Sequence, residues 1–490
     1  MYRSARYHEP LLRDIQEGHT CFPLPKVNVP TTLQRKNPVC LPDLEELQLM
    51  RHYLHLSQMN YGVENGMYPL GSCTMKYNPK LCEAISQWDA FTLTHPYQDP
   101  STIQGTLQLM HELEHMLCQI TGMDAITLQP AAGAQGEFTG LLIARAYHDH
   151  RHDTTRTEII LPNTAHGTNP ASASMAGYSV IEIPSTSEGT VDLDALKKTV
   201  SEHTACFMLT NPNTLGIFES EIEEIAKIVH AKGALLYYDG ANLNAILGKA
   251  RPGDMGFDIV HINLHKTFST PHGGGGPGSG PVGVKKHLEP YLPIPRIIKK
   301  KDTYAFSYDY PQSIGKIKAW YGNTSALIKA YTYILLMGGD GLTETAEIAV
   351  LNANYMKHKL VASGLYDLPY RSLRKHEFVL SADRLLTTKG IRALDIAKRL
   401  LDYGLHPPTV YFPHIVKEAL MIEPTESESK QTLDVYIQAL ITIAQEDASL
   451  SKAAPHETAV RRIDEVGAVK NPILTWKALE KTVVTPERGV

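Results

Sequence analysis

The sequence predicts an α/β protein with a large domain built on a mostly parallel sheet and a smaller α+β domain at the C-terminal end. Between about residues 104 and 290, short apolar runs alternate with helical segments, which is typical of a parallel sheet covered by helices on both faces. After about residue 320, two long helical segments lead to one short apolar run and then to another helix. With 490 residues, the chain is also too long for a single ordinary core.

This pattern divides the chain into three parts. We expect a proline-rich, extended arm over 1–65, a large domain over 66–335, and a small C-terminal domain with a tail over 336–490.

Apolar residues at helical spacing predict the helices, and short apolar runs predict the strands. Helices are expected over 43–58, 104–120, 138–147, 193–203, 222–230, 325–337, 342–361 and 391–401. Strands are expected over 125–128, 158–161, 178–183, 205–209, 234–238, 257–262 and 378–381. Ligands of such sheets bind at the carboxyl ends of the strands, so the loops that follow the strands are where chemistry is expected.

Composition and charge exclude several classes of protein. The net charge is −5, and Lys and Arg are scattered and outnumbered by acids, so no nucleic-acid surface is indicated. The six cysteines form no C-x-x-C pair, which argues against a disulfide framework or a zinc knuckle. The chain has no run of about 18 apolar residues and no apolar signal core, so we expect a cytoplasmic protein without a membrane segment.

Lys266 stands in a small, polar loop after the strand expected over 257–262, and a glycine run over 273–276 follows it. A lysine at a strand end can attack a carbonyl group when desolvation or a nearby cation lowers its pKa. The glycines would let the backbone approach a ligand or move over it. A solvated surface lysine beside a flexible loop is the alternative reading.

Asp239 follows the apolar run 234–238 and precedes Lys266 by 27 residues, with a loop and one strand between them. A buried carboxylate needs a cationic partner, and a pyridinium nitrogen is one. An Asx turn or a helix N-cap is the alternative role.

The segment 129–137 lies between a strand and the helix expected to begin near Phe138. Its small residues would expose backbone N–H groups at a helix N-terminus, which suits a phosphate group. The absence of G-x-G-x-x-G and G-K-[ST] disfavours a nucleotide.

Two further polar loops follow strands. His166 could lay its imidazole over a planar ring, or it could cap a turn. Thr210 and Asn211 could donate hydrogen bonds to a ring hydroxyl, or they could form an Asn-Pro turn.

His111, Glu112 and His115 match H-E-x-x-H on a predicted helix, the pattern of zinc metalloproteases. Glu137 has a plausible offset for a third ligand, but it lies in the proposed phosphate loop. Zinc hydrolysis is therefore a remote alternative, and no metal is expected.

Four segments resemble a known family: 264–268 with the glycine run, 165–171, 68–79 and 421–427. They resemble fold-type I pyridoxal 5′-phosphate (PLP) enzymes, and much more closely the glycine decarboxylase, or P-protein, of the glycine cleavage system. The resemblance implies a fold-type I PLP-dependent transferase in which Lys266 holds the cofactor, Asp239 faces the pyridine nitrogen and His166 stacks on the ring. Lys266 and His166 are the expected catalytic residues. The expected cofactor site comprises Lys266, His265, Asp239, Ala241, His166, Thr210, Asn211, Ala134, Gln135 and Gly136.

The motifs also place four residues near the substrate, namely Ser72, Cys73, Thr74 and His95. The sequence does not identify the group that binds the substrate carboxylate, and Arg371 and Arg374 are the candidates. A redox role for Cys73 and a packing role both stay open.

Single-chain P-proteins are about twice as long as this chain, which is similar to their cofactor-carrying half. The resemblance thus implies the second subunit of a split P-protein, paired with a first subunit in an α2β2 assembly. It implies decarboxylation of glycine through an external aldimine, transfer of the aminomethyl group to the lipoyl arm of H-protein, and action alongside the T- and L-proteins. Another fold-type I PLP enzyme, such as an aminotransferase or an amino-acid decarboxylase, and a cofactor-free structural subunit are the alternatives.

Overall fold

The computed structural model describes residues 5–12, 28–37, 44–273 and 278–482. Most of the glycine run at 273–276, and the first residue of the helix expected over 43–58, lie outside the described residues. No helix among the described residues is long and apolar enough to cross a membrane.

A seven-stranded sheet forms the centre of the larger body, with strand order β1-β7-β6-β5-β4-β2-β3. Its strands are β1 (Ala125–Thr127), β2 (Glu158–Pro162), β3 (Ser179–Ile183), β4 (Thr204–Thr210), β5 (Leu235–Gly240), β6 (Ile259–Ile262) and β7 (Val282–Val284). Strands β6, β5, β4, β2 and β3 run parallel, whereas β7 pairs antiparallel with both β1 and β6. The mostly parallel sheet expected from the sequence is confirmed.

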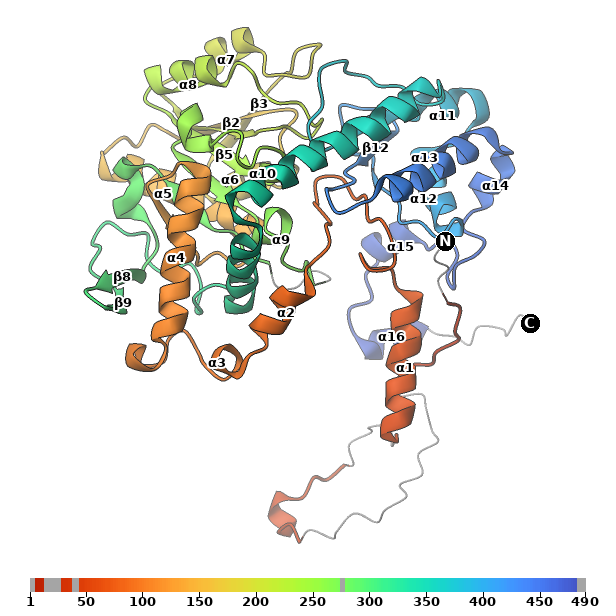
Figure 1. Cartoon of the computed structure of the whole chain (residues 1–490), viewed down its shortest axis with the longest axis horizontal. Coiled ribbons are helices and arrows are strands. Elements are labelled where there is room, and N and C mark those ends of the chain that lie inside the picture. Colours follow the sequence, from red (N-terminus) through yellow and green to blue (C-terminus); the bar gives the residue numbers. More distant parts are fainter. Residues whose placement is uncertain (1–4, 13–27, 38–43, 274–277, 483–490) are drawn as a thin grey trace.

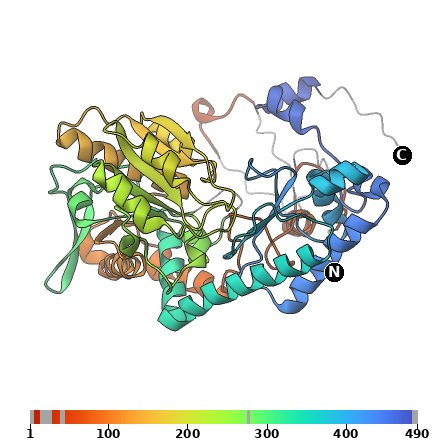
Figure 2. The ribbon, with the colours of Figure 1, turned by 90° about the horizontal axis from the view of Figure 1, so that it is seen from above.

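Helices cover both faces of this sheet (Figures 1 and 2). Strand β5 shows why its run is apolar throughout, because Leu236 and Tyr238 pack in the core on one face while Leu235 and Tyr237 pack on the other. The helices around the sheet are α4 (Gln104–Thr121), α5 (Gly133–His150), α6 (Asn169–Met175), α7 (Leu193–Thr199), α8 (Ile222–Ala231) and the short α9 (Leu264–Thr267).

Three features of this body differ from the expectation. Helix α5 begins at Gly133 and not near Phe138, so the second half of the proposed phosphate loop is the first helical turn. Strand β7 was not predicted, since a three-residue strand with a central glycine leaves no pattern. The hairpin of β8 (Arg296–Lys300) and β9 (Thr303–Ser307) was also not predicted, because exposed lysines interrupt its apolar residues.

Helix α10 (Thr324–Ala362) joins the two bodies of the molecule (Figures 1 and 2). It merges the two helices expected over 325–337 and 342–361, with a break at Gly338, whose φ is 62°. Beyond it lies an antiparallel sheet of order β10-β12-β11, made of β10 (Phe378–Ser381), β11 (Thr409–Val410) and β12 (Ala419–Ile422). Around this sheet lie α11 (Asp383–Lys389), α12 (Ala393–Asp402), α13 (Lys430–Gln445) and α14 (Ala448–Ala453).

The second body has its own apolar core, which includes Phe378, Leu420 and Tyr436. Near the ends of the chain lie α1 (Glu46–Met59), which extends away from both bodies in Figure 1, and α15 (Glu465–Lys470) with α16 (Trp476–Thr482). Two short helices, α2 (Lys80–Ser86) and α3 (Asp89–Thr92), precede α4. The domain boundaries after residues 65 and 335 stay a prediction.

Candidate active site

Asp239 lies inside the sheet as the next-to-last residue of β5, and its side chain is fully buried. Its Oδ1 accepts the backbone N–H of Ala241 at 2.9 Å, and its Oδ2 accepts the hydroxyl of Thr210 at 3.2 Å. His261 on the neighbouring strand β6 places Nε2 3.1 Å from Oδ1. Burial alone would raise the pKa of Asp239, but His261, His166 and the N–H of Ala241 together outweigh it and hold that pKa well below the usual range. Asp239 is therefore an ionised carboxylate at the end of a buried strand.

His261 was not identified from the sequence, although it was visible there as an imidazole inside an apolar run. Its Nδ1 lies 3.1 Å from the hydroxyl of Tyr237, which also donates to the carbonyl oxygen of Gly136 at 3.2 Å. A contiguous chain of polar contacts thus runs from the first turn of α5 through Tyr237 and His261 to Asp239.

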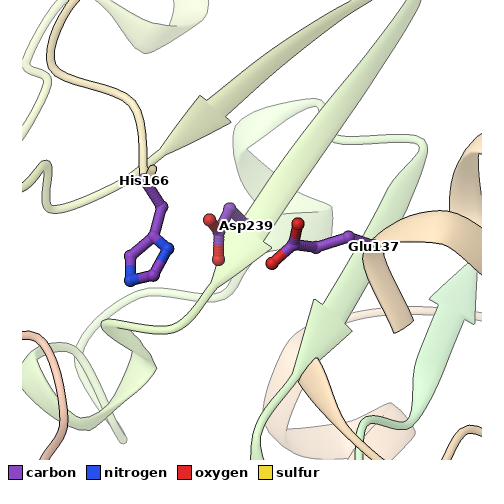
Figure 3. A group of neighbouring side chains, drawn as sticks. All are labelled: Glu137, His166 and Asp239. Atoms are coloured by element: carbon purple, nitrogen blue, oxygen red, sulfur yellow. The ribbon is translucent and has the colours of Figure 1, made fainter. Parts of the chain in front are cut away.

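Glu137, His166 and Asp239 converge on one point from three different elements (Figure 3). Their potential ligand atoms lie within 4.8 Å of one another. The carboxylate of Glu137 accepts the hydroxyls of Thr168 at 2.7 Å and Ser172 at 2.8 Å. Burial and the charge of Asp239 raise the pKa of Glu137.

The imidazole of His166 is neutral at neutral pH. Burial, followed by the charge of Lys266, lowers its pKa to about 4. A neutral ring beside Asp239 offers a flat, uncharged face to a planar ligand, and stacking on a cofactor ring stays a prediction.

Lys266 is carried by α9, directly after β6, and only 9% of its surface is exposed. Among the described residues, no carboxylate lies within ion-pair distance of its Nζ. Its charge nevertheless acts on several neighbours. Together with burial it lowers the pKa values of His166 and His265, and it opposes the burial that raises the pKa of Cys73. A buried lysine without a counter-ion is costly unless its amine has another use.

The N-terminus of α5 has no side-chain cap on its N-cap residue Ala132. The side chain of Gln135 is occupied, since it accepts the N–H of Ala131 at 2.7 Å and donates to the carbonyl of Ile317 at 3.2 Å. The N–H of Gly136 already donates to the carbonyl of Ala132 at 2.9 Å. An anion at this point would therefore meet the helix dipole and the backbone N–H groups of residues 133–135.

Several buried polar atoms have no hydrogen-bond partner in the described part of the chain. Near the strand ends these are Asn211 Nδ2, Thr267 Oγ1, Thr270 Oγ1 and Ser279 Oγ. Buried polar groups are nearly always paired, so these donors indicate a missing polar ligand. A ligand with an anionic group and a ring hydroxyl, such as PLP, fits a set of donors of this kind.

Two further predicted cofactor residues have defined neighbours. The Nδ1 of His265 accepts the N–H of Ser279 at 3.2 Å, and its ring stands perpendicular to that of His272, with 5.2 Å between centroids. Ala241 contributes its N–H to the orientation of Asp239.

The predicted substrate residues divide into two groups. Ser72, Cys73 and Thr74 form a tight loop in which Ser72 and Thr74 have φ values of 64° and 49°. Burial raises the pKa of Cys73 to about 11, and the charge of Lys266 opposes this shift. The segment that follows this loop contacts the chain near Lys266, because Ser269 donates its hydroxyl to the carbonyl oxygen of Tyr77 and its own carbonyl oxygen accepts the side-chain amide of Asn78 at 2.8 Å. The ring of His95 packs edge-on against Trp320 at 4.7 Å and accepts the N–H of Tyr97 at 3.1 Å, and its place near the substrate stays a prediction.

The two arginine candidates have different surroundings. Arg371 is exposed. Arg374 is buried, and its guanidinium donates to the carbonyl oxygens of Ser372 and Tyr370 within its own loop.

Two of the sequence motifs, far apart in the chain, meet in the structure. Residue Leu70 forms a β-bridge with Ile422, and the N–H of Tyr77 donates to Ser427 Oγ at 3.0 Å. The buried Nζ of Lys76 lies 2.8 Å from Glu426 Oε1. The segments 68–79 and 421–427 therefore form a single unit beside Lys266.

The H-E-x-x-H segment does not form a metal centre with three ligands among the described residues. The rings of His111 and His115 stand edge to face at 4.5 Å, and Glu112 accepts a hydrogen bond from the hydroxyl of Tyr331. Glu137, the suggested third ligand, belongs to the group with His166 and Asp239.

Comparisons with known proteins indicate one family for nearly the whole chain. Residues 23–308 match the family model of the glycine cleavage system P-protein, and residues 345–462 match that of the glycine dehydrogenase C-terminal domain. The chain is 60% identical over 489 residues to a probable glycine dehydrogenase (decarboxylating) subunit 2 of Pyrococcus horikoshii, covering 97% of each chain. A protein of the same description from Caldanaerobacter subterraneus is 57% identical over 474 residues, covering 94% of this chain and 97% of that one.

Solved structures of other proteins have a fold similar to that of this chain. The crystal structure of a glycine decarboxylase (P-protein) of the glycine cleavage system, in inhibitor-bound form, has a TM-score of 0.71 at 19% identity and covers 85% of this chain and 93% of that chain. A NifS-like protein has a TM-score of 0.60 at 16% identity, covering 78% of this chain and 99% of that one. These likenesses confirm the expected fold class.

Proposed function

This chain belongs to the family of glycine dehydrogenase (decarboxylating) subunit 2, and from that premise we propose that it is the cofactor-carrying subunit that decarboxylates glycine with PLP. The observation that carries the proposal is the pairing of an ionised Asp239, held by His261, with a buried Lys266 that has no counter-ion among the described residues. An aminotransferase shares the fold, but the relatives at 60% identity favour glycine decarboxylation.

When bound, PLP supplies a carbonyl carbon that amines attack and a pyridinium ring that takes up the electrons released when CO2 leaves. Lys266 would hold its carbonyl carbon, Asp239 its ring nitrogen, and the N-terminus of α5 its phosphate. The unpaired Nδ2 of Asn211 suits the ring hydroxyl, and Thr210 keeps Asp239 in place.

Each side chain of this site has a role that follows from its charge. Ionised Asp239 stabilises a proton on the ring nitrogen, and His261 prevents burial from neutralising that carboxylate. Neutral His166 covers the ring face without adding a charge that would oppose a cationic ring. Lys266 Nζ is a buried amine of this site that could hold or hand on a proton.

The proposal includes partners. The name of the relatives implies a first subunit, and we expect an α2β2 assembly in the cytoplasm. The aminomethyl group left by decarboxylation would pass to the lipoyl arm of H-protein, with the T- and L-proteins completing the cycle.

The test uses this chain co-purified with its partner subunit. After borohydride reduction and proteolysis, mass spectrometry is expected to find the cofactor on Lys266, and the Lys266→Ala variant should lose it. Lys249→Ala, on a surface ion pair with Glu347, is the matched control that keeps the label. A label on another lysine contradicts the site assignment.

A second measurement tests the reaction. Exchange of labelled CO2 into the carboxyl group of glycine should require both subunits and lipoylated H-protein. Full exchange by this chain alone would contradict the split-subunit reading, and exchange with another amino acid in place of glycine would contradict the substrate.

A further inference from the structure

Two glutamates face each other beside the proposed active site without being part of the machinery described above. Glu377 immediately precedes β10 and Glu423 immediately follows β12, one position beyond the antiparallel pair Phe378 and Ile422. Both side chains are fully buried. Their oxygens and a ring nitrogen of His376 lie within 4.8 Å of one another.

The two carboxyl groups accept hydrogen bonds from both ends of the loop that carries Cys73. Glu377 accepts the backbone N–H of Ser72 at 2.8 Å and the side-chain amide of Asn242 at 3.0 Å. Glu423 accepts the backbone N–H of Thr74 at 2.9 Å and its hydroxyl at 2.6 Å. These bonds reach across more than 300 residues of sequence, from the second body of the molecule to the Ser72–Thr74 loop.

Direct cationic partners are missing among the described residues around the pair. His376 Nε2 lies 3.6 Å from Glu423 Oε1, but burial and the charge of Lys266 lower the pKa of His376 to about 3, so this imidazole is neutral. Glu426, the other nearby acid, is bound to Lys76. The charge that remains is that of Lys266, which acts on both carboxyl groups.

Two buried carboxylates this close cannot both ionise without a large cost. Burial and the charge of Glu423 raise the pKa of Glu377 well above its ordinary value, and burial raises that of Glu423. Each glutamate uses both of its oxygens as acceptors, which a glutamine with its single accepting oxygen could not do. The four bonds therefore require two carboxyl groups at this point, although their closeness penalises two charges.

We propose that Glu377 and Glu423 share one proton and act as positioning residues, which hold the Ser72–Thr74 loop against Lys266 and keep one negative charge facing its Nζ. The pair is then the counter-ion that Lys266 otherwise lacks whenever its amine is free. The role for the lysine rests on the proposed function, whereas the shared proton is a property of the chain itself.

Infrared difference spectroscopy on the cofactor-free protein complex tests the shared proton at neutral pH. The wild type is compared with Glu377→Gln, Glu423→Gln and the double variant. With one shared proton, each single variant loses one protonated-carboxyl band, because the remaining glutamate ionises, and the double variant also loses one band. Loss of two bands in the double variant, or of none in any variant, overturns the proposal.

The pH dependence of PLP uptake by the same proteins tests the counter-ion. The double variant lacks the negative charge of the pair, so the Lys266 amine should lose its proton at lower pH and the uptake profile should move to lower pH by about one unit or more. Each single variant keeps one negative charge and should move the profile less. Glu219→Gln is the matched control, since Glu219 is also buried and accepts the N–H of Val191 and Glu221. An unmoved profile in the double variant refutes the counter-ion role, while a wild type that takes up no PLP refutes the proposed function instead.

Discussion

His261 and Asp239 are direct neighbours across the parallel strands β6 and β5, with His261 Nε2 3.1 Å from Asp239 Oδ1. The register of the two strands fixes this contact, because Asp239 pairs with His261 in the ladder. The same strands end beside Lys266, so the group that keeps Asp239 ionised is part of the sheet and not of a loop.

Replacing His261 with alanine should weaken the binding of PLP. Asp239 would lose its hydrogen bond with His261, and burial would raise the pKa of Asp239. A hydrogen bond to a charged group contributes about 1.5–3 kcal/mol, or roughly ten- to a hundred-fold in affinity. Titration of PLP into the cofactor-free complex measures the effect. His261→Gln, which can still donate one hydrogen bond, should recover part of the loss.

The matched control for this prediction is His230→Ala. His230 Nε2 also pairs with an aspartate, Asp258, at 2.8 Å. Asp258 precedes β6, however, whereas Lys266 follows it, so this pair lies at the opposite end of the strand. Its variant should bind PLP as the wild type does. Equal affinities for the His261 and His230 variants would show that His261 does not support the cofactor.

Cys73 should react slowly with alkylating reagents. Its pKa of about 11 leaves roughly a hundred-fold less thiolate at neutral pH than the ordinary value of 9.0 would, and the thiolate is the reactive form. Iodoacetamide labelling followed by mass spectrometry should show a rate that rises with pH and reaches the ordinary value after unfolding in urea. Rapid labelling of the folded protein would instead favour a redox role.

The gathering of the candidate residues at one end of the sheet was predictable from the sequence because these residues follow strands. Parallel strands bring their carboxyl ends to one edge, so the order of Asp239 and Lys266 along the chain was enough to predict that they lie together. His261 was not identified from the sequence because it lies inside a strand, where an imidazole looks like one polar interruption of an apolar run.

The carboxyl pair could not be predicted in the same way. Glu377 and Glu423 meet the Ser72–Thr74 loop only after two bodies of the molecule dock, and no local pattern encodes a contact across 300 residues.

Gly216→Ala should destabilise the folded protein by more than about 2 kcal/mol. Gly216 has a φ of 75°, and a Cβ there would lie 1.9 Å from the carbonyl oxygen of Glu377. A left-handed conformation alone costs about 1–2 kcal/mol for other residues, and the clash with backbone adds to it. Gly364→Ala is the control, because Gly364 has a φ of 71° with open space around its Cβ. Urea midpoints that shift equally for the two variants would show that the contact with Glu377 is unimportant.

Glu114 should make the protein less stable as the pH rises. Burial raises its pKa from 4.5 to about 8, although its Oε1 accepts the hydroxyl of Tyr321 at 3.2 Å. The folded state therefore holds this proton to a higher pH than the unfolded chain does. The contribution of Glu114 to stability is complete below 4.5, decreases as the pH rises, and is lost above about 8. Melting temperatures across this range should fall less steeply for Glu114→Gln than for the wild type.

Glu112, two residues away on α4, gives the opposite sign and so serves as the control. The hydrogen bond from Tyr331 lowers its pKa, so its contribution is present above 4.5 and is lost as the pH falls through the lowered value. Glu112→Gln should therefore lose stability at neutral pH and approach the wild type in acid. If the Glu114 and Glu112 variants both keep the pH slope of the wild type, then neither the burial of Glu114 nor the hydrogen bond to Glu112 controls the pH dependence of stability.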